Sequence, residues 1–509
     1  MSVHDFYVLS PYLAMAGAAL LIILLDLALP KKSLLPYLTF AALAGPLVMS
    51  VIQVYDLGSA SNLLEGADAF STEEPSILLG AISVDRFALF FNFLIIGSVA
   101  LTALASADYV KNMERFQGEY IALILFAATG MMLLAAATEL ITIYVSLELT
   151  TLPMAALTAF LMNQRSSEAG MKFLIIGGVS SALMLYGMAL VFGFTGSTEL
   201  AEISNAVGKA TGDMPFGNYA LFVGIILMIA GFGFKLSAAP FQMWVPDVYE
   251  GGPTTVIAFL SVASKAAAFA IVIRVFFTGF FDVALDWGIL IAGIAAASMV
   301  IGNLVAISQS NIRRLFGYST VSHAGYILVG VAAGVKSGDG VFKAPEFAAI
   351  GLDSVLFYLV AYAVANLTAF FAITIISSKI KSDQISDYAG LSTRNPALAI
   401  LLALSLLALV GVPPTGIFIA KLYVFTAAVD SGLVWLAILG VINSAVSAYY
   451  YVRIIKVMFT QQSASEEKIT ASPAPWLALW VAGAAMVFMG IAPGFVMEAA
   501  QNAVKALAV

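Results

Sequence analysis

The 509-residue chain has no cysteine and only two histidines. The absence of thiolates excludes a cysteine-ligated iron–sulfur cluster, and two histidines argue against a bis-histidine haem. The sequence therefore predicts that the chain carries no electrons itself, binds no cofactor and holds no metal ion.

Charged residues are also scarce: they make up 10% of the chain, against about 25% in an ordinary soluble protein. Hydrophobic residues make up 61%, and the polar stretches between apolar runs are no longer than about 30 residues. This leaves no room for a soluble domain with a nucleotide, a flavin or a catalytic cleft, and no nucleic-acid partner is expected. The composition predicts a polytopic membrane protein whose chemistry takes place within the bilayer.

Apolar runs of about 20 residues, the length of a helix that crosses a bilayer, recur along the whole chain. They predict an all-α membrane protein with fourteen transmembrane helices. The predicted spans are residues 11–29, 33–54, 87–107, 119–138, 139–161, 170–195, 218–250, 253–278, 284–307, 315–334, 348–377, 396–427, 432–457 and 474–495.

Lysine and arginine are distributed unequally between the loops. If successive loops alternate sides, fourteen of these residues follow odd-numbered spans and five lie on the opposite side. Cytoplasmic loops carry the excess of positive charge, so both termini are expected on the outer, periplasmic side of a bacterial inner (plasma) membrane. No basic segment precedes the first apolar run, which is therefore expected to be a retained span.

A few ionisable residues lie inside predicted spans, although a charge at the bilayer centre is costly. At the helical rise of 1.5 Å per residue, the glutamate in span five and the lysine in span eight lie roughly 13–18 Å deep, near the midplane. The candidate proton-carrying residues are Glu148, Lys235, Lys265, His323 and Lys421. Two further acids are weaker candidates: Asp26 is expected to be interfacial and Asp353 structural.

Two of the lysines lie beside predicted helix breaks. Pro240 interrupts the overlong run that contains Lys235, and Pro413 and Pro414 interrupt the run that contains Lys421. Broken helices at membrane depth line cavities, and in many transporters they occur at corresponding positions of repeated halves. The two lysines are 186 residues apart, which fits two five-span repeats, spans 4–8 and 9–13. Since five is odd, these repeats are expected to be inverted.

This interpretation divides the chain into four parts. They are an amino-terminal three-helix segment (1–118), a first five-helix repeat (119–280), a second, inverted repeat (281–460) and a carboxyl-terminal helix (461–509).

The row of ionisable groups is chemically suited to protons. Burial favours the neutral form of a lysine, whereas a nearby carboxylate favours the charged form. Lys235 is therefore expected to keep its proton beside Glu148 and to release it when the two are separated. Sodium prefers clustered oxygen ligands, which the row does not offer. A single buried lysine also fits a structural salt bridge, and His323 alone fits a hydrogen-bonded core residue, but five such groups at one depth favour a functional row.

Four stretches carry a resemblance to a known family. They are FKLSAAPFQMWVPDVYEGGPTTVIAFLSVASKAAAF at 234–269, YVSLELTTLP at 144–153, NIRRLFGYSTVSHAGY at 311–326 and GVPPTGIFIAKLYVF at 411–425. Together they resemble the antiporter-like proton-translocating membrane subunits of respiratory complex I, the NADH-quinone oxidoreductase. PDVYEGGPT followed by SVASKAA is similar to the subunit N family rather than to the M or L families.

The resemblance implies a subunit that moves protons when quinone reduction elsewhere in the complex drives it. Glu148, Lys235, Lys265 and Lys421 match the family's charged positions in spans 5, 7, 8 and 12, and His323 matches the histidine of its YSS-x-x-H-x-GY pattern. The resemblance also implies FMN, iron–sulfur clusters and quinone in other subunits. The implied partners are an M-type subunit, small hydrophobic subunits and lipids.

One departure from the family pattern and two other functions stay open. Gln242 stands where PFH-x-W has its histidine, so a proton role for that position is open. A subunit of a multi-subunit cation/proton antiporter shares the same architecture in spans 7, 8 and 12. A structural spacer in a redox complex is the other alternative, and it predicts that neutralising Lys235 or Lys421 affects assembly but not pumping.

Overall fold

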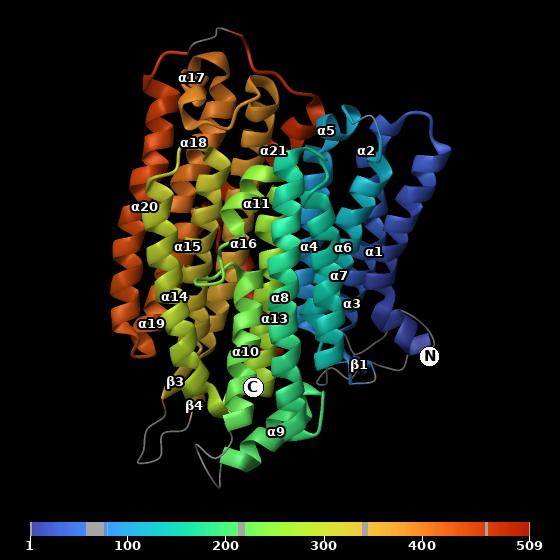
Figure 1. The fold of residues 1–509 in the computed structure, drawn as a ribbon, viewed down its shortest axis with the longest axis vertical. Helices are drawn as coiled ribbons and strands as arrows, with labels where there is room; N and C mark the ends of the chain where they lie inside the picture. The colour runs from blue at the N-terminus through green and yellow to red at the C-terminus, as the bar shows by residue number, and fades with distance from the viewer. Residues whose placement is uncertain are drawn as a thin grey trace.

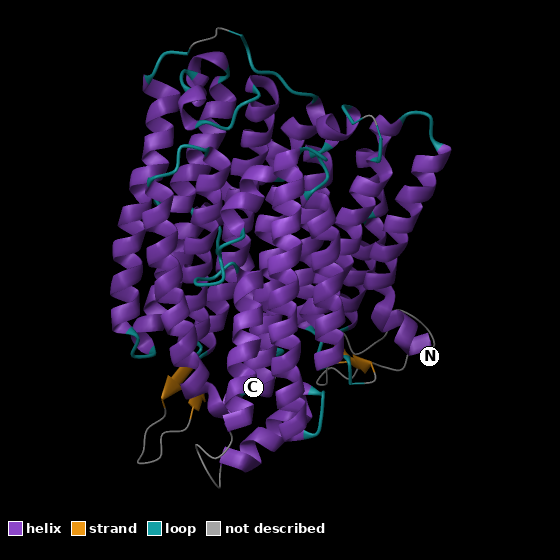
Figure 2. Ribbon diagram, in the orientation of Figure 1, coloured by secondary structure: helices purple, strands orange, loops and turns teal. Residues whose placement is uncertain are grey.

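The computed structural model describes residues 3–57, 76–78, 80–113, 115–211, 219–337, 345–463 and 467–507. Nearly all of them are helical, and the helices lie side by side in one bundle (Figures 1 and 2). Among the described residues, 13 helices are long and apolar enough to cross a membrane. They match the predicted spans except for span 12, which is split into two shorter helices. The predicted all-α architecture is confirmed.

The amino-terminal segment comprises three spans and a hairpin. The 3₁₀ helix η1 and helices α2 and α3 together form the second span, and β1 pairs antiparallel with β2. The elements are α1 (Val3–Ala28), η1 (Lys32–Leu34), α2 (Leu35–Ala42), α3 (Ala44–Asp56), β1 (Ser76–Leu78), β2 (Ile82–Val84), α4 (Arg86–Ala105) and α5 (Ala107–Lys111).

The next five spans form the first repeat. Its last span is continuous but contains two π-helical turns, η2 and η3. The elements are α6 (Gln117–Ala136), α7 (Leu140–Thr158), α8 (Gln164–Thr195), α9 (Leu200–Thr211), α10 (Tyr219–Leu236), α11 (Val245–Gly251), α12 (Thr254–Phe259), η2 (Leu260–Ser264), α13 (Lys265–Arg274) and η3 (Val275–Gly279).

The second repeat and the carboxyl-terminal helices follow. Strands β3 and β4 pair antiparallel. The elements are η4 (Phe281–Val283), α14 (Ala284–Ile307), α15 (Ile312–Ala333), β3 (Val335–Ser337), β4 (Pro345–Phe347), α16 (Ala349–Ile380), η5 (Ile385–Tyr388), α17 (Leu391–Arg394), α18 (Pro396–Val410), α19 (Gly416–Asp430), α20 (Val434–Thr460), α21 (Pro473–Ile491) and α22 (Gly494–Lys505).

The helix pairs α6–α7 and α14–α15 pack with the same residue register. A Cβ atom on Gly130 would lie 2.7 Å from the backbone nitrogen of Thr150, and a Cβ on Gly302 would lie 2.6 Å from that of Ser322. Glycine is required at both crossings because the helix backbones touch. Each residue of the second pair follows its counterpart by 172 positions, which supports two repeats beginning at α6 and α14.

The two repeats run in opposite directions through the bundle. Helix α6 begins at the end that holds α5, whereas α14 begins at the other end, where α9 and both hairpins lie (Figure 1). Both termini of the chain also lie toward this second end (Figure 1). The inversion expected from an odd number of spans is therefore present.

A buried ion pair fastens the amino-terminal segment to the first repeat. Arg274 donates two hydrogen bonds to Asp85, at 2.8 and 2.9 Å, and both side chains are about 95% buried. Asp85 also caps α4 by accepting from the backbone of Ala88 at 2.7 Å. Arg274 donates further to the carbonyl of Ala135 in α6 at 3.1 Å. One arginine thus joins α4, α6 and α13.

Both helix breaks lie where the prolines predict them. The loop between α10 and α11 lies at mid-height of the bundle, green in Figure 1 and teal in Figure 2. It contains Pro240 and also Ser237, which has a φ of 60°. The loop between α18 and α19 contains Pro413 and Pro414. These two loops position the lysines of spans 7 and 12.

Candidate functional site

Lys235 lies in the last turn of α10, immediately before the first break, and is 9% exposed. Its ammonium donates a hydrogen bond to Thr151 Oγ1 of α7. Thr151 in turn donates to the carbonyl of Leu147 at 2.6 Å, so its oxygen is oriented to accept from the lysine. The position at a helix carboxyl terminus also favours a cation, because the helix dipole is negative there.

Glu148 lies one turn before Thr151 on α7, and residues three apart share a helix face. Its Oε1 atom is buried without a hydrogen-bond partner in the structure. None of the ion pairs within 4 Å formed by the described residues joins Glu148 to Lys235. The lysine is therefore bonded to a neutral hydroxyl, while the carboxylate lies nearby and unpaired.

Lys265 is the first residue of α13, directly after the π-helical turn η2, and is 3% exposed. Its ammonium donates to Ser237 Oγ, the first side chain after α10, and lies 5.5 Å from the ring centroid of Trp244. π-Helical turns occur frequently at functional sites, where they re-aim a side chain. Lys265 thus binds the break that follows Lys235.

The same break is anchored from both of its sides. Trp244 Nε1 donates at 3.2 Å to the carbonyl of Phe234, which also accepts from the backbone nitrogen of Ser237 at 3.0 Å. The backbone nitrogen of Ala239 donates to Ser298 Oγ of α14 at 2.8 Å. Because α14 belongs to the second repeat, this hydrogen bond connects the first break to the other half of the molecule.

His323 lies on α15, is 1% exposed, and shares a 2.9 Å hydrogen bond between its Nδ1 and the hydroxyl of Tyr358 on α16. Its ring lies 5.0 Å from the ring of Tyr362 and 5.8 Å from that of Tyr326, measured between centroids. In the register that relates α7 to α15, His323 corresponds to Thr151. A titratable ring in the second repeat therefore replaces the hydroxyl that holds a lysine in the first.

Lys421 lies on α19, after the second break, and is 5% exposed. Its ammonium donates at 2.8 Å to the carbonyl of Val410, the last residue of α18, and at 2.8 Å to Ser444 Oγ of α20. It also lies 4.5 Å from the ring centroid of Tyr326. Lys421 therefore spans the break and satisfies the carbonyl left open at the end of α18.

The two break lysines do not occupy equivalent positions of the repeats. Lys235 precedes its break, whereas Lys421 follows its break. Their separation of 186 residues also differs from the 172-residue register of the paired helices. Each repeat thus has a buried lysine beside its break, before the break in the first repeat and after it in the second.

Neutral polar side chains extend the site around Lys421, and the sequence analysis missed them. Asn303 of α14 donates to the hydroxyl of Tyr326 at 3.2 Å and to Asn443 Oδ1 of α20 at 3.4 Å. It accepts from the hydroxyl of Tyr450 at 3.0 Å. Asn303 and Asn443 were detectable in principle, because amides within apolar spans often bond across helices.

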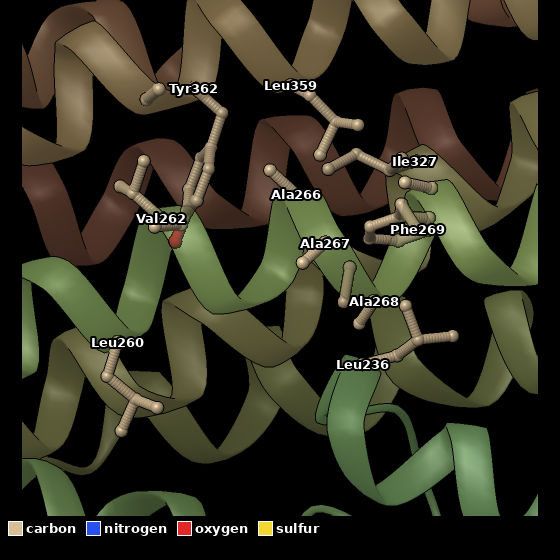
Figure 3. Packing of buried hydrophobic residues seen from close by; sticks show 14 of the residues in the cluster. Leu236, Leu260, Val262, Ala266, Ala267, Ala268, Phe269, Ile327, Leu359 and Tyr362 are labelled. Atoms are coloured by element: carbon tan, nitrogen blue, oxygen red, sulfur yellow. The ribbon is translucent and has the colours of Figure 1, made fainter. Parts of the chain in front are cut away.

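The helix that bears Lys265 packs against α16 through an apolar layer. Figure 3 shows Val262 and Ala266 facing Leu359 and Tyr362, with Tyr362 extending toward Val262. One polar contact crosses nearby, from Asn366 of α16 to Ser261 of η2 at 2.6 Å. This contact lies between the helix that bears Lys265 and α16, whose Tyr362 (Figure 3) also packs against the His323 ring.

The two weaker acidic candidates lie near helix ends, and Gln242 lies in the first break. Asp26 pairs with Lys32 at 3.0 Å near the end of α1, as expected for an interfacial carboxylate. Asp353 lies in the first turns of α16, with its Oδ1 atom buried and without a hydrogen-bond partner. Gln242 lies in the first break with a buried, unpartnered Oε1.

Comparison with known proteins identifies the family. The NADH-quinone oxidoreductase subunit N of Dehalococcoides mccartyi is 42% identical over 499 residues, which cover 97% of this chain and 98% of that protein. The chain belongs to the NADH-quinone oxidoreductase subunit N family. A family model described as "NADH:quinone oxidoreductase/Mrp antiporter, TM" matches residues 137–447, a range that contains all five candidate residues. The resemblance seen in the four motifs is confirmed.

Solved structures share the fold of this chain. A chain of respiratory complex I from Thermus thermophilus with bound aureothin is 28% identical, with a TM-score of 0.76, covering 96% of this chain and 98% of that chain. A chain of the Mrp complex from Dietzia sp. DQ12-45-1b has a TM-score of 0.81 at 19% identity, covering 100% and 98%. The second likeness shows a shared fold.

Proposed function

We propose that this chain is a non-redox subunit of an NADH-quinone oxidoreductase and translocates protons when quinone reduction in other subunits drives it. The observation that carries the proposal is a series of buried basic side chains, each hydrogen-bonded to a neutral group. When such a side chain loses its proton, its neutral partner is not left as an unpaired buried charge. The residues are Lys235, Lys265, His323 and Lys421, with Glu148 as the switch.

The switch works by exchanging the partner of Lys235. When the ammonium pairs with Glu148, the carboxylate stabilises its charge and holds the proton. When it moves to Thr151, three residues or about 4.5 Å along α7, it keeps a hydrogen bond but loses the counter-charge. The proton can then pass to the next group. The hydrogen bond to Thr151 supports this open arrangement.

The lateral step passes from Lys265 to the His323 group and on to Lys421. The first part crosses the apolar layer of Figure 3, so it requires water to enter that layer. The second part, from the His323 group to Lys421, already has a connecting side chain, because the ring of Tyr326 contacts His323 and lies beneath the Lys421 ammonium. Hydration of the layer is therefore the controlled step of lateral transfer.

The same proposal covers the orientation, the parts and the partners of the chain. The end of the bundle with α5 and α17 faces the cytoplasm of a bacterium, and both termini face outward. The parts are the predicted segment 1–118, repeats 119–280 and 281–460, and helix 461–509. FMN, iron–sulfur clusters and quinone belong to other subunits, and the neighbours are an M-type subunit and small hydrophobic subunits. The Thermus thermophilus likeness supports this assembly.

Proton pumping by a Lys235→Ala variant tests the proposed function. Inverted membrane vesicles would be assayed for pumping and for quinone reductase activity, with complex assembly checked in parallel. We expect both activities to fall strongly in an assembled complex. Normal activity and pumping would return Lys235 to a structural role, and loss of assembly alone would favour the structural spacer.

A cation/proton antiporter is the second candidate and is less supported. The Mrp likeness favours it at the level of fold, and the family model names both classes. Eight curated relatives at 37–42% identity are named NADH-quinone oxidoreductase subunit N. Sodium-dependent transport by the purified complex in the absence of an electron donor would favour the antiporter.

A further inference from the structure

A large apolar groove lies on the outside of the bundle, away from the row of lysines. It has a volume of about 980 Å³ and is lined by α3, α4, α16 and α22. This volume reaches the upper end of the range for small-molecule sites, roughly 300–1,000 Å³. An apolar space of this size loses its packing contacts unless something fills it. The groove therefore needs an occupant.

Arg86 and Tyr55 place two polar groups at one end of the groove, whose lining also contains Asn502 and Ser98. Arg86 begins α4, Tyr55 lies in the last turn of α3, and Asn502 lies on the carboxyl-terminal helix α22. Arg86 is exposed, and the adjacent carboxylate of Asp85 is committed to its buried pair with Arg274. The Arg86 guanidinium is thus free of this neighbouring negative charge and suited to bind a phosphate, because its planar fork matches phosphate oxygens.

The lining of the groove along α4 is somewhat longer than the hydrocarbon thickness of one leaflet. Along α4 the lining runs from Arg86 to Leu101, a distance of about 22 Å at the helical rise. Half of the hydrocarbon core measures roughly 15 Å. A transmembrane helix of another subunit would need to cross the full core, about 30 Å. The dimensions and the polarity at one end fit a lipid better than a helix.

We propose that this groove binds one anionic phospholipid, with its phosphate at Arg86 and an acyl chain along α4 and α16. The head group also meets Tyr55 and Asn502, which donate hydrogen bonds. Phe495 of α22, which also lines the groove, is 76% exposed and adds apolar surface for an acyl chain. The lipid fills the space between the amino-terminal segment and the second repeat.

Two glycines provide a matched pair of variants. A Cβ atom added at Gly97 of α4, which lines the groove, meets no atom within 4 Å. A Cβ added at Gly178 of α8, outside the groove, also meets none. Gly97→Phe should fill the groove without disturbing the protein, whereas Gly178→Phe adds the same side chain to an exposed helix face elsewhere.

The test uses the purified intact complex and a phosphatidylglycerol probe with a photoreactive group in its acyl chain. We expect labelled peptides from α4 and α16 in the wild type and in Gly178→Phe, and loss of most of this labelling in Gly97→Phe. Arg86→Gln should reduce labelling by the anionic probe about fivefold, as one basic residue near an anionic surface predicts. Labelling by a neutral diacylglycerol probe, which lacks the phosphate, should not change in Arg86→Gln.

Three results would overturn the proposal. Equal labelling of α4 and α16 in Gly97→Phe and Gly178→Phe would place the lipid elsewhere. A photoreactive residue at Leu94 that captures another protein subunit instead of lipid would assign the groove to a subunit interface. Equal labelling of wild type by the anionic and the neutral probe would refute the assignment of the head group.

Discussion

Replacing Thr151 by valine tests the partner exchange of Lys235 most directly. Valine keeps the size and branching of threonine but removes Oγ1, the acceptor that holds the Lys235 ammonium. A hydrogen bond to a charged group contributes about 1.5–3 kcal/mol. Its loss should shift Lys235 toward Glu148 by the same amount, which corresponds to roughly 10- to 150-fold in the equilibrium. The lysine should then remain paired and fail to pass its proton.

The assay is quinone reductase activity and proton uptake by inverted vesicles that contain the assembled complex. We expect both to fall at least several-fold in Thr151→Val. Thr151→Ser retains a hydroxyl and serves as the matched control, so its pumping should stay near the wild-type level. Wild-type pumping by an assembled Thr151→Val complex would refute the role of Thr151 as the second acceptor.

Combination with Glu148→Gln separates the switch from a general packing defect. Residues of one network show non-additive effects, whereas independent defects add. If the valine acts by trapping Lys235 on the carboxylate, it should cause little further loss once Glu148→Gln has removed that trap. Fully additive losses would indicate that Thr151 supports packing and not the exchange.

Two further predictions concern the framework of the site. Gly411 has a φ of 88°, and a Cβ there would lie 3.2 Å from Lys421 Cδ. Gly411→Ala should therefore cost roughly 1–2 kcal/mol of stability, lower the thermal stability of the complex and reduce pumping. Unchanged thermal stability and pumping would contradict the assigned geometry. Asp85→Asn should leave the Arg274 charge buried and uncompensated at about 3–5 kcal/mol, so we expect little assembled complex on native gels, whereas Asp85→Leu combined with Arg274→Met should restore assembly.

The sequence predicted the spans and the buried charges well because both depend on one strong physical rule. Placing a charge or an unpaired backbone group in hydrocarbon is unfavourable, so each exception is visible in the sequence. Lys235 and Lys421 were detectable in this way, and the prolines marked the breaks beside them. The structure places all of these residues in buried, hydrogen-bonded positions.

The partners of the lysines were not predictable by the same rule. Thr151 and Ser444 are ordinary residues in membrane helices, where a hydroxyl commonly bonds to its own backbone, and Ser237 lies in the loop of the first break. Their role depends on which helices meet, and hydropathy contains little information on helix pairing. The sequence therefore suggested a carboxylate partner for Lys235, since Glu148 was the only visible charge nearby, and missed the hydroxyl one turn away.

The choice of partner explains how one molecule can hold some buried charges permanently and release others. The bidentate pair of Arg274 with Asp85 holds a guanidinium, the side chain best suited to a buried ion pair, and joins three helices. A lysine can lose its proton, and a pair of unit charges 4 Å apart gains about 4 kcal/mol at an effective dielectric constant of 20. That attraction would hold the proton of a permanently paired lysine. Hydroxyl and carbonyl partners hold the ammonium in place by weaker hydrogen bonds and accept the neutral amine as well, so under the proposed function we expect Lys265 and Lys421 to exchange protons while the helices around them stay fixed.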